Sequence, residues 1–213
     1  MSTPNITIVD YGLGNLMSVS QAVTHVGGNP VLTSDPEVVA AAERIILPGV
    51  GAFVVAMGFL RELGLDRALE EANSRGTALL GICLGMQLLF SESLEFGRTS
   101  GLGFVEGSVR PVVDDETEDL GVRSTHIGWR SLDVADAGVN HPLFEKTKPD
   151  DSVYFVHSYS CHSTNPGHTL ATVNYAGTEI AAAVGAGNVV GVQFHPEKSG
   201  PAGLRILENF CGA

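Results

Sequence analysis

The sequence predicts an α/β fold: a central, mostly parallel sheet flanked by helices, with additional antiparallel strands in the second half. Strand-like apolar runs alternate with helical segments over residues 5–90, a pattern typical of a sheet with helices on both faces. The 213 residues are 44% hydrophobic and only 17% charged, and they include 26 glycines, as expected of buried strands. This length predicts a single domain, 1–213.

The first half alternates between strands and helices. Short aliphatic runs predict strands at 5–10, 29–33, 44–47 and 77–82. Leu16, Val19, Val23 and Val26 share one helical face, so a helix follows the first strand, with Asn15 at the position of an N-cap. Further helices are expected at 36–42, 53–60, 65–74 and 84–90.

In the second half, strands follow one another with few helices between them. Short strands separated by turns are expected at 108–113, 125–129, 152–157, 170–175, 180–184 and 189–193, which together favour an antiparallel arrangement. Asp114–Asp119 carries five acids in six residues and reads as a solvated turn. A last helix should begin near Pro201 and end near Cys211.

Charge and motif content exclude several functions. The formal net charge of −12 argues against nucleic-acid binding and against binding to an anionic membrane. No apolar run is long enough to span a bilayer, and no signal peptide is visible. Three cysteines without a Cys-x-x-Cys pair favour free thiols and a cytoplasmic location. We expect no cofactor, since neither a Walker loop nor a dinucleotide fingerprint is complete.

No metal site is expected either. His157, His162 and His168 could in principle supply ligands, but no helical His-x-x-x-His pattern or cysteine pair accompanies them.

The segment Gly81-Ile-Cys83-Leu-Gly85 is the strongest indication of chemistry. A nucleophile between a strand and a helix requires a sharp turn, and glycines two residues before and after it relieve the steric conflict there. Backbone N–H groups at such a turn favour a thiolate, and that of Leu84 could stabilise an oxyanion. The alternative is an inert buried cysteine, which remains our interpretation of Cys161 and Cys211.

A base for this thiol is expected at the end of the run Val189–Phe194. His195 follows that run and precedes Pro196, which keeps it extended, so Glu197 can approach and orient the ring. Alone, the pair could equally be a surface ion pair. Similarly, Pro48-Gly-Val-Gly51 could be an ordinary turn, or its glycines could let the Val50 peptide present its N–H to a ligand.

Three motifs together resemble the class I (triad) glutamine amidotransferase family. They are Pro48-Gly-Val-Gly-Ala-Phe53, Gly81-Ile-Cys-Leu-Gly-Met-Gln87 and Val192-Gln-Phe-His-Pro-Glu197. Three further segments look like the branch formed by glutaminase subunits of imidazole glycerol phosphate synthase, an enzyme of histidine biosynthesis: Asp10-Tyr-Gly-Leu-Gly-Asn-Leu16, His126-Ile-Gly-Trp129 and Tyr154-Phe-Val-His-Ser-Tyr159. The resemblance extends over essentially the whole chain and implies the flavodoxin-like class I glutaminase fold.

The resemblance also implies a role for individual residues. Cys83 would be the nucleophile, His195 the base and acid, and Glu197 the carboxylate that orients it. The remaining residues implied are Val50 and Leu84 for the oxyanion hole, Gly49, Gly51, Gln87, Ser158 and Tyr159 for glutamine binding, and Asn15, Trp129 and Tyr154 for the partner interface. The partner would be a separate cyclase subunit with a β/α-barrel fold, to which ammonia is delivered.

Three other functions stay open on the sequence. The chain could be a glutaminase of the same class that serves a different synthase. It could be a flavodoxin-like binding module without catalysis. It could also be a cysteine peptidase or hydrolase built on the same sheet.

Overall fold

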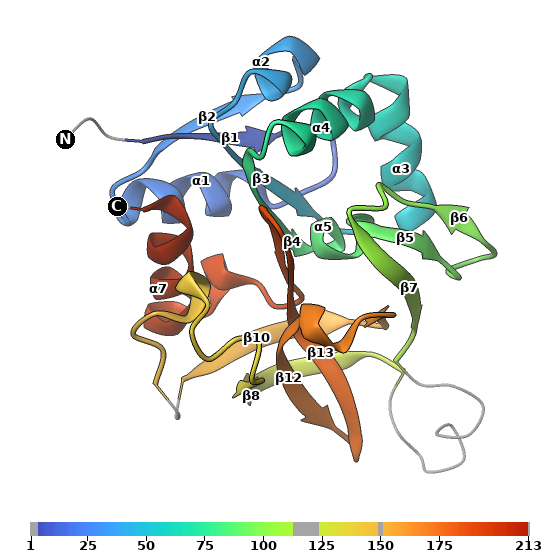
Figure 1. Ribbon diagram of the computed structural model, residues 1–213, viewed down its shortest axis with the longest axis vertical. Coiled ribbons are helices and arrows are strands. Elements are labelled where there is room, and N and C mark those ends of the chain that lie inside the picture. Colours follow the sequence, from blue (N-terminus) through green and yellow to red (C-terminus); the bar gives the residue numbers. More distant parts are fainter. Residues whose placement is uncertain (1–3, 113–123, 149–150, 213) are drawn as a thin grey trace.

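The computed structural model describes residues 4–112, 124–148 and 151–212, and its centre is a large mixed sheet. Within these residues the sheet has eight strands in the order β2-β1-β3-β4-β14-β13-β12-β9 (Figure 1). The strands from β2 to β14 run parallel to their neighbours, and β13, β12 and β9 continue the sheet in antiparallel fashion. The predicted α/β fold with a mostly parallel sheet is therefore confirmed.

The elements of the large sheet and its helices have the following bounds. The strands are β1 (Asn5–Val9), β2 (Asn29–Thr33), β3 (Arg44–Gly49), β4 (Ala78–Cys83), β9 (Asp133–Val134), β12 (Thr169–Tyr175), β13 (Thr178–Ala186) and β14 (Val189–Val192). The helices are α1 (Leu16–His25), α2 (Pro36–Ala40), α3 (Phe53–Glu62), α4 (Leu65–Ser74), α5 (Leu84–Leu88) and α7 (Gly200–Cys211). Three 3-10 turns are η1 (Pro142–Phe144), η2 (Pro166–His168) and η3 (Pro196–Lys198).

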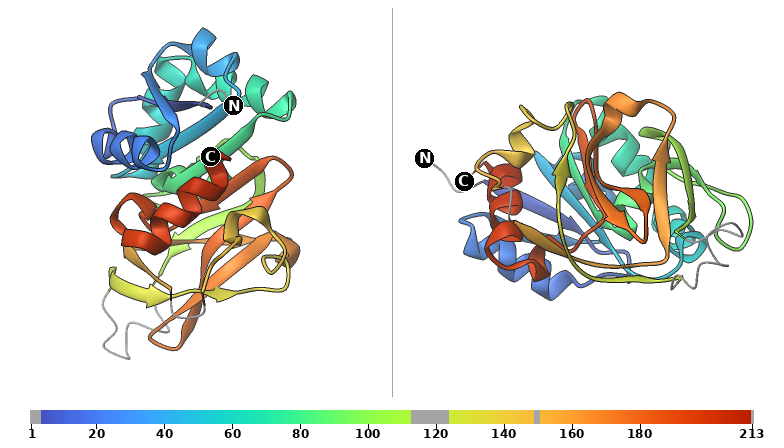
Figure 2. Two further views of the ribbon diagram at one scale, coloured as in Figure 1. Left: turned by 90° about the vertical axis from the view of Figure 1, so that its left-hand side faces the viewer. Right: turned by 90° about the horizontal axis from the view of Figure 1, so that it is seen from below.

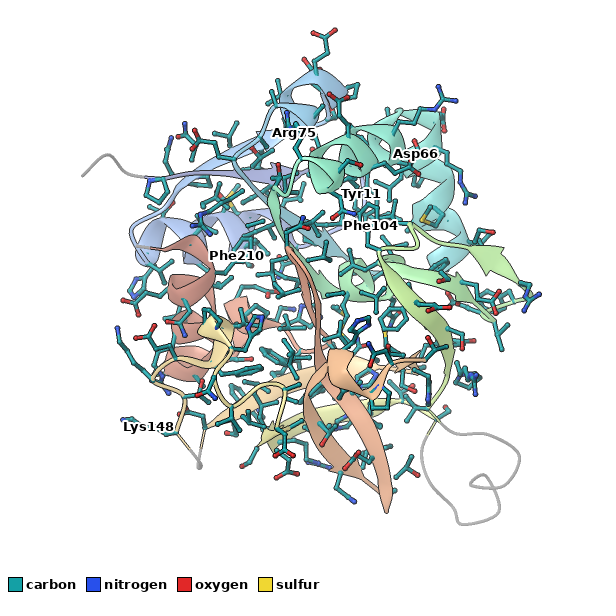
Figure 3. The ribbon with its side chains drawn as sticks, in the orientation of Figure 1. Tyr11, Asp66, Arg75, Phe104, Lys148 and Phe210 are labelled. Carbon is teal, nitrogen blue, oxygen red and sulfur yellow. The ribbon has the colours of Figure 1, made fainter. Side chains whose placement is uncertain are left out.

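Helices cover both faces of the sheet because its strands are apolar on both faces. Along β3, Ile46 faces one core, shared with α1 and α7, whereas Ile45 and Leu47 face the other, shared with α3, α4 and α5. Figure 2 shows α7 beside α1. Phe210 of α7 belongs to the first core and Tyr11 to the second, and both are labelled in Figure 3.

The second half adds two smaller sheets. β10 (Ser152–His157) pairs with β8 (His126–Ser131), and a four-stranded sheet has the order β11-β7-β5-β6. The strands of the latter are β5 (Phe90–Ser93), β6 (Thr99–Ser100), β7 (Val105–Pro111) and β11 (Tyr159–Ser163). β5, β6, β9 and β11 were not expected from the sequence, and β14 is parallel to β4 although an antiparallel arrangement was predicted.

The expected helix 84–90 is too long. α5 ends at Leu88, and Phe90 begins β5. The reason is competition for carbonyl groups: the carbonyl oxygens of Leu88 and Leu89 accept hydrogen bonds from the backbone N–H groups of Leu102 and Val105. An apolar run such as Leu88-Leu89-Phe90 fits both a helix and a buried strand, so periodicity alone could not place this boundary.

Two smaller expectations also need correction. Asn15 occupies the N-cap position of α1, but its side chain makes no capping hydrogen bond. β3 continues through Gly49 because it pairs with β4 along its whole length, with Gly49 opposite Cys83.

The acidic segment Asp114–Asp119 lies outside the described residues. Among the described helices, none is long and apolar enough to cross a membrane.

Candidate active site

Cys83 lies on a sharp turn between β4 and α5. Its backbone has φ 55° and ψ −112°, a conformation that non-glycine residues seldom adopt. A Cβ atom on Gly81 would lie 2.6 Å from the Gly85 carbonyl oxygen, and one on Gly85 would collide with the Leu47 carbonyl oxygen. The two glycines are therefore required for close approach of the backbone, as the sequence predicted for this turn.

His195 and Glu197 form a buried pair beside this turn. His195 Nδ1 lies 2.8 Å from Glu197 Oε1, and the two side chains are 3% and 0% exposed. The contact was predicted, but its backbone basis differs. Only His195 is extended, whereas Glu197 lies in the 3-10 turn η3. Ser199 Oγ donates a hydrogen bond to the His195 carbonyl oxygen at 2.6 Å and so ties this turn to the end of the sheet.

The protonation of His195 is set by these partners. Burial disfavours the charged ring, but hydrogen bonds and charge interactions with Cys83 and Glu197 outweigh it and raise the pKa of His195 from 6.5 to about 9. At neutral pH the ring is therefore an imidazolium, with one N–H on Glu197 and the other side toward Cys83. This arrangement can hold a cysteine as thiolate and can also deliver a proton.

A cavity of about 710 Å³ opens in front of Cys83. This volume is within the usual range for small-molecule sites. The residues that line it are Val50, Gly51, Cys83, Leu84, Gln87, Glu95, Phe96, Pro111, Ser124, Thr125, Val156, His157, Ser158, Tyr159 and His195. The structure therefore brings together the expected Val50, Gly51, Leu84, Gln87, Ser158 and Tyr159 around the cysteine and histidine.

Gly49 is the exception among the expected binding residues. It lies behind the cavity wall, where a Cβ atom would be 3.0 Å from the Leu84 Cβ and closer still to the Tyr11 hydroxyl group. That hydroxyl donates a 2.9 Å hydrogen bond to the Pro48 carbonyl oxygen. Gly49 thus allows close packing at the start of the glycine turn rather than lining the site.

Several residues of the site were not predicted. Glu95, Phe96 and Thr125 line the cavity, and Gln193 is fully buried beside Cys83. Glu95 accepts a 2.6 Å hydrogen bond from the backbone N–H of Phe53, at the start of α3, and no local sequence signal joins these two segments. For Gln193 a signal existed, because a polar side chain within the apolar run Val189–Phe194 needs a buried partner.

The expected interface residues lie next to the site. Trp129 and Tyr154 face each other across the β8–β10 pair, with ring centroids 5.8 Å apart, and Trp129 is 51% exposed. Asn15 borders a small hollow that Val50, His195 and Glu197 also border. The Tyr154 carbonyl oxygen accepts a 3.0 Å hydrogen bond from the backbone N–H of His195, so the β8–β10 pair adjoins the candidate triad.

Two further buried histidines, His126 and His157, lie beside the cavity, and His157 is part of its wall. His157 Nδ1 is 2.9 Å from the Tyr159 carbonyl oxygen, and His157 Nε2 is 3.0 Å from His126 Nδ1. Burial, together with the neighbouring ring, lowers the pKa of His126 to about 4, and burial lowers that of His157 to about 4. Both rings are neutral at pH 7. Among the described residues, no group of three or more His, Cys, Asp or Glu side chains is placed to hold a metal ion.

Comparisons with known proteins agree with this geometry. The sequence model of the family "Glutamine amidotransferase class-I" matches residues 7–212. The imidazole glycerol phosphate synthase subunit HisH of Methanosarcina barkeri is 45% identical over 207 residues, which is 96% of each chain. The protein of the same name from a Geobacillus species is 44% identical over 206 residues, covering 97% of this chain and 95% of that one.

Solved structures support the fold alone. The structure of PurLQS from Thermotoga maritima matches with a TM-score of 0.74 and 20% identity over 99% of each chain. The glutaminase domain of CTPS from Trypanosoma brucei, with bound acivicin, gives 0.67 and 16% identity over 99% of this chain and 94% of that chain. The family match over nearly the full length and the curated relatives above 40% identity lead to one conclusion: the chain belongs to the class I glutamine amidotransferases.

Proposed function

We propose that this chain is the glutaminase subunit of an imidazole glycerol phosphate synthase and hydrolyses L-glutamine to glutamate and ammonia. The observation that carries this proposal is that Cys83 and His195 line one cavity of suitable size, with the Glu197 carboxylate 2.8 Å from His195 Nδ1. The choice of synthase rests on relatives named HisH, which are 41–45% identical over nearly the whole chain.

Acyl transfer to sulfur is the first half of the reaction. The Cys83 thiolate attacks the carbonyl carbon of the glutamine carboxamide, and the C=O electron pair moves onto oxygen. When this tetrahedral adduct collapses, the C–N bond breaks and His195 gives its proton to the departing nitrogen. Ammonia leaves and a thioester to Cys83 remains.

Hydrolysis of the thioester is the second half. His195, now neutral, takes a proton from water as the water oxygen attacks the same carbon. The C–S bond then breaks, which releases glutamate and restores the thiolate beside the imidazolium. Glu197 keeps the ring in one tautomer throughout, since its Oε1 is 2.8 Å from His195 Nδ1.

The developing oxyanion would be stabilised by backbone N–H groups of Leu84 and Val50. Leu84 follows the nucleophile directly, whereas the Val50 peptide would reach its position after a rearrangement. Gly51, with φ +101°, supports such a rearrangement, and Val50 is 41% exposed at the cavity rim. If docking of the partner turns this peptide, glutaminase turnover should rise about 100- to 1000-fold on complex formation, and equal rates would disprove it.

Glutamine would be held by Gly51, Gln87, Ser158 and Tyr159 on the cavity wall, with Gly49 shaping the turn behind them. The partner would be a separate cyclase subunit, a β/α barrel that docks over Asn15, Trp129 and Tyr154. Ammonia would pass into it and react to give imidazole glycerol phosphate and aminoimidazole carboxamide ribotide. A chain of net charge −12 is poorly suited to bind a phosphorylated acceptor, which agrees with this division of labour.

The decisive experiment compares two nitrogen sources in the complex with the cyclase subunit. Cys83→Ala should abolish synthase activity with glutamine and leave activity with ammonium salts intact. Cys161→Ala is the matched control, because Cys161 is also a free, buried thiol but belongs to the core and does not line the cavity. Loss of both activities in Cys83→Ala, or of neither, would contradict the proposal.

The same assay separates the remaining alternatives. A glutaminase of another synthase would release glutamate only with a different partner and acceptor. A binding module would form no covalent adduct at Cys83 with a glutamine-like electrophile, and a peptidase would cleave peptides and ignore free glutamine.

A further inference from the structure

We propose that Gln193 is a further residue of the active site, whose side-chain amide donates a hydrogen bond to Cys83 Sγ and stabilises the thiolate. The inference rests on the proposed glutaminase function, since it concerns the same nucleophile. Gln193 stands inside the motif Val192-Gln-Phe-His-Pro-Glu197, but none of the roles implied by the resemblance falls to it.

Strand register places Gln193 at the sulfur atom. β14 runs parallel to β4 with Val192 opposite Ile82, so Gln193, the residue directly after β14, comes next to Cys83, the last residue of β4. The Gln193 side chain is fully buried, and its backbone N–H donates to the Ala182 carbonyl oxygen at 2.9 Å. Its Nε2 lies 3.8 Å from Cys83 Sγ, within reach of a hydrogen bond to sulfur.

The orientation of the Gln193 amide follows from its other contact. Gln87 Nε2 lies 3.2 Å from the backbone carbonyl oxygen of Tyr159 and 3.1 Å from Gln193 Oε1. A backbone carbonyl can only accept, so this end of Gln87 must be its NH₂ group, and Gln193 must accept with its oxygen. The NH₂ group of Gln193 is then the end that faces Cys83.

The hydrogen bonds of His126 and His157 have directions that are consistent with this orientation of the two amides. The Tyr159 carbonyl oxygen also takes the N–H of His157 Nδ1, which leaves His157 Nε2 as acceptor for His126 Nδ1–H. Hydrogen bonds therefore lead from His126 on β8 through His157 to Tyr159, and from Gln87 through Gln193 to the sulfur. Every member of this chain is neutral at pH 7, so it supplies a fixed donor without adding charge.

The other titratable groups near the sulfur do not replace this donor. Burial raises the pKa of both the Tyr11 hydroxyl and the Cys161 thiol, so both stay neutral at pH 7. His195 is then the cation that faces Cys83, and Gln193, directly after the neighbouring strand β14, is the neutral donor. A hydrogen bond to the charged form of an acid favours that form, so removing the donor should leave less Cys83 thiolate and a less reactive sulfur.

The test measures the reactivity of Cys83 in the full chain. The rate of iodoacetamide alkylation is followed at pH 7, with the modified residue identified by mass spectrometry. Gln193→Met removes the donor at similar length, and Gln193→Glu keeps the shape and the acceptor for Gln87 but turns an oxygen toward the sulfur. We expect the rate of Cys83 alkylation to fall about tenfold in the first and by more in the second, because less of the sulfur is held as thiolate.

Matched controls and a second readout separate the outcomes. Ser160→Ala removes a different buried polar group, a hydroxyl that contacts His162 instead of Cys83, and should leave the alkylation rate unchanged. In the complex, glutamine-dependent kcat should fall about tenfold for Gln193→Met, with ammonia-dependent activity retained. An unchanged alkylation rate in both Gln193 variants overturns this inference and leaves the glutaminase intact. A wild-type complex that hydrolyses no glutamine overturns the proposed function itself.

Discussion

Two histidines on the cavity wall, His195 and His157, are buried to a similar degree, but their pKa values are shifted in opposite directions. His195 is 3% exposed and His157 is 6% exposed. The pKa of His195 is raised to about 9, whereas that of His157 is lowered to about 4. The difference lies in their partners: His195 contacts a carboxylate and a thiol, and His157 contacts a backbone carbonyl and a neutral ring.

The comparison shows that burial alone does not decide the charge of a histidine. Burial lowers the pKa of both rings, and only a charged partner reverses the sign. The side of the cavity with His195 is thus arranged to carry a proton that can move. The side with His126 and His157 is arranged to remain neutral and to fix the direction of hydrogen bonds. Each prediction below tests whether this separation holds.

The largest effect on turnover should come from His195→Gln, and His157→Gln is the matched comparison. His195→Gln removes the group that takes and returns the proton, and losing one member of such a triad costs on the order of 10⁴- to 10⁶-fold in turnover. His157→Gln keeps a donor for the Tyr159 carbonyl oxygen, so we expect a loss of about tenfold or less. Glutamate release by the complex at pH 7.5 measures both. Comparable losses in the two variants would remove the distinction between the two sides.

The next effect concerns the carboxylate that sets the sign at His195. Glu197→Gln retains a hydrogen-bond acceptor but removes the charge, so the pKa of His195 should fall from about 9 to a value nearer that of His157. In wild type the ring is protonated below about pH 9, and in the variant it should lose its proton at lower pH. Turnover should fall roughly 100- to 10⁴-fold.

Titration of His195 by NMR provides the direct measurement for Glu197→Gln. Glu197 Oε2 is buried and makes no hydrogen bond among the described residues, so His195 is the partner of this carboxylate. A His195 pKa that stays near 9 in the variant would show that Cys83 alone sustains the charge.

Acid stability should be governed by the other side of the cavity. The pKa values of His126 and His157 are near 4 in the folded protein against 6.5 in the unfolded chain. The unfolded state therefore binds more protons between these values, and the free energy of unfolding should fall as the pH drops from 6.5 to 4. The expected loss is on the order of 3 kcal/mol for each ring that must stay neutral.

His195 has the opposite sign in this respect. Its pKa is raised, so its contribution to stability is complete below pH 6.5 and is lost as the pH rises toward 9. The free energy of unfolding is measured with urea at pH 7 and pH 5, for wild type and for His126→Asn, which lacks one titrating ring. Burial also lowers the pKa values of His141 and His162, but these two residues contribute equally to wild type and to the variant, so the difference between the two chains reports on the His126–His157 pair. An unchanged pH dependence in His126→Asn would contradict the expectation.

The sequence predicts the two sides of the cavity unequally, for a physical reason. Cys83, His195 and Glu197 carry local signals: a glycine-flanked turn and an i, i+2 pair at a strand end. Gln193 and the His126–His157 pair depend on strand pairing between segments far apart in the chain, such as β8 with β10. The same holds for the fold, where residues 5–83 follow local periodicity and β5, β6, β9 and β11 depend on distant partners.

The smallest effect tests what keeps His126 neutral. The ring of Tyr175 lies 4.3 Å from that of His126 and the ring of Phe155 lies 4.9 Å away, while the Tyr175 hydroxyl donates to the Thr125 carbonyl oxygen at 3.2 Å. Tyr175→Phe keeps the aromatic ring and removes the hydroxyl group. The free energy of unfolding should therefore fall by only about 1 kcal/mol. Because the desolvating ring remains, the loss of stability between pH 7 and pH 5 should be the same as in wild type. A smaller loss in Tyr175→Phe would mean that the hydroxyl group, and not burial against the ring, holds the pKa of His126 low.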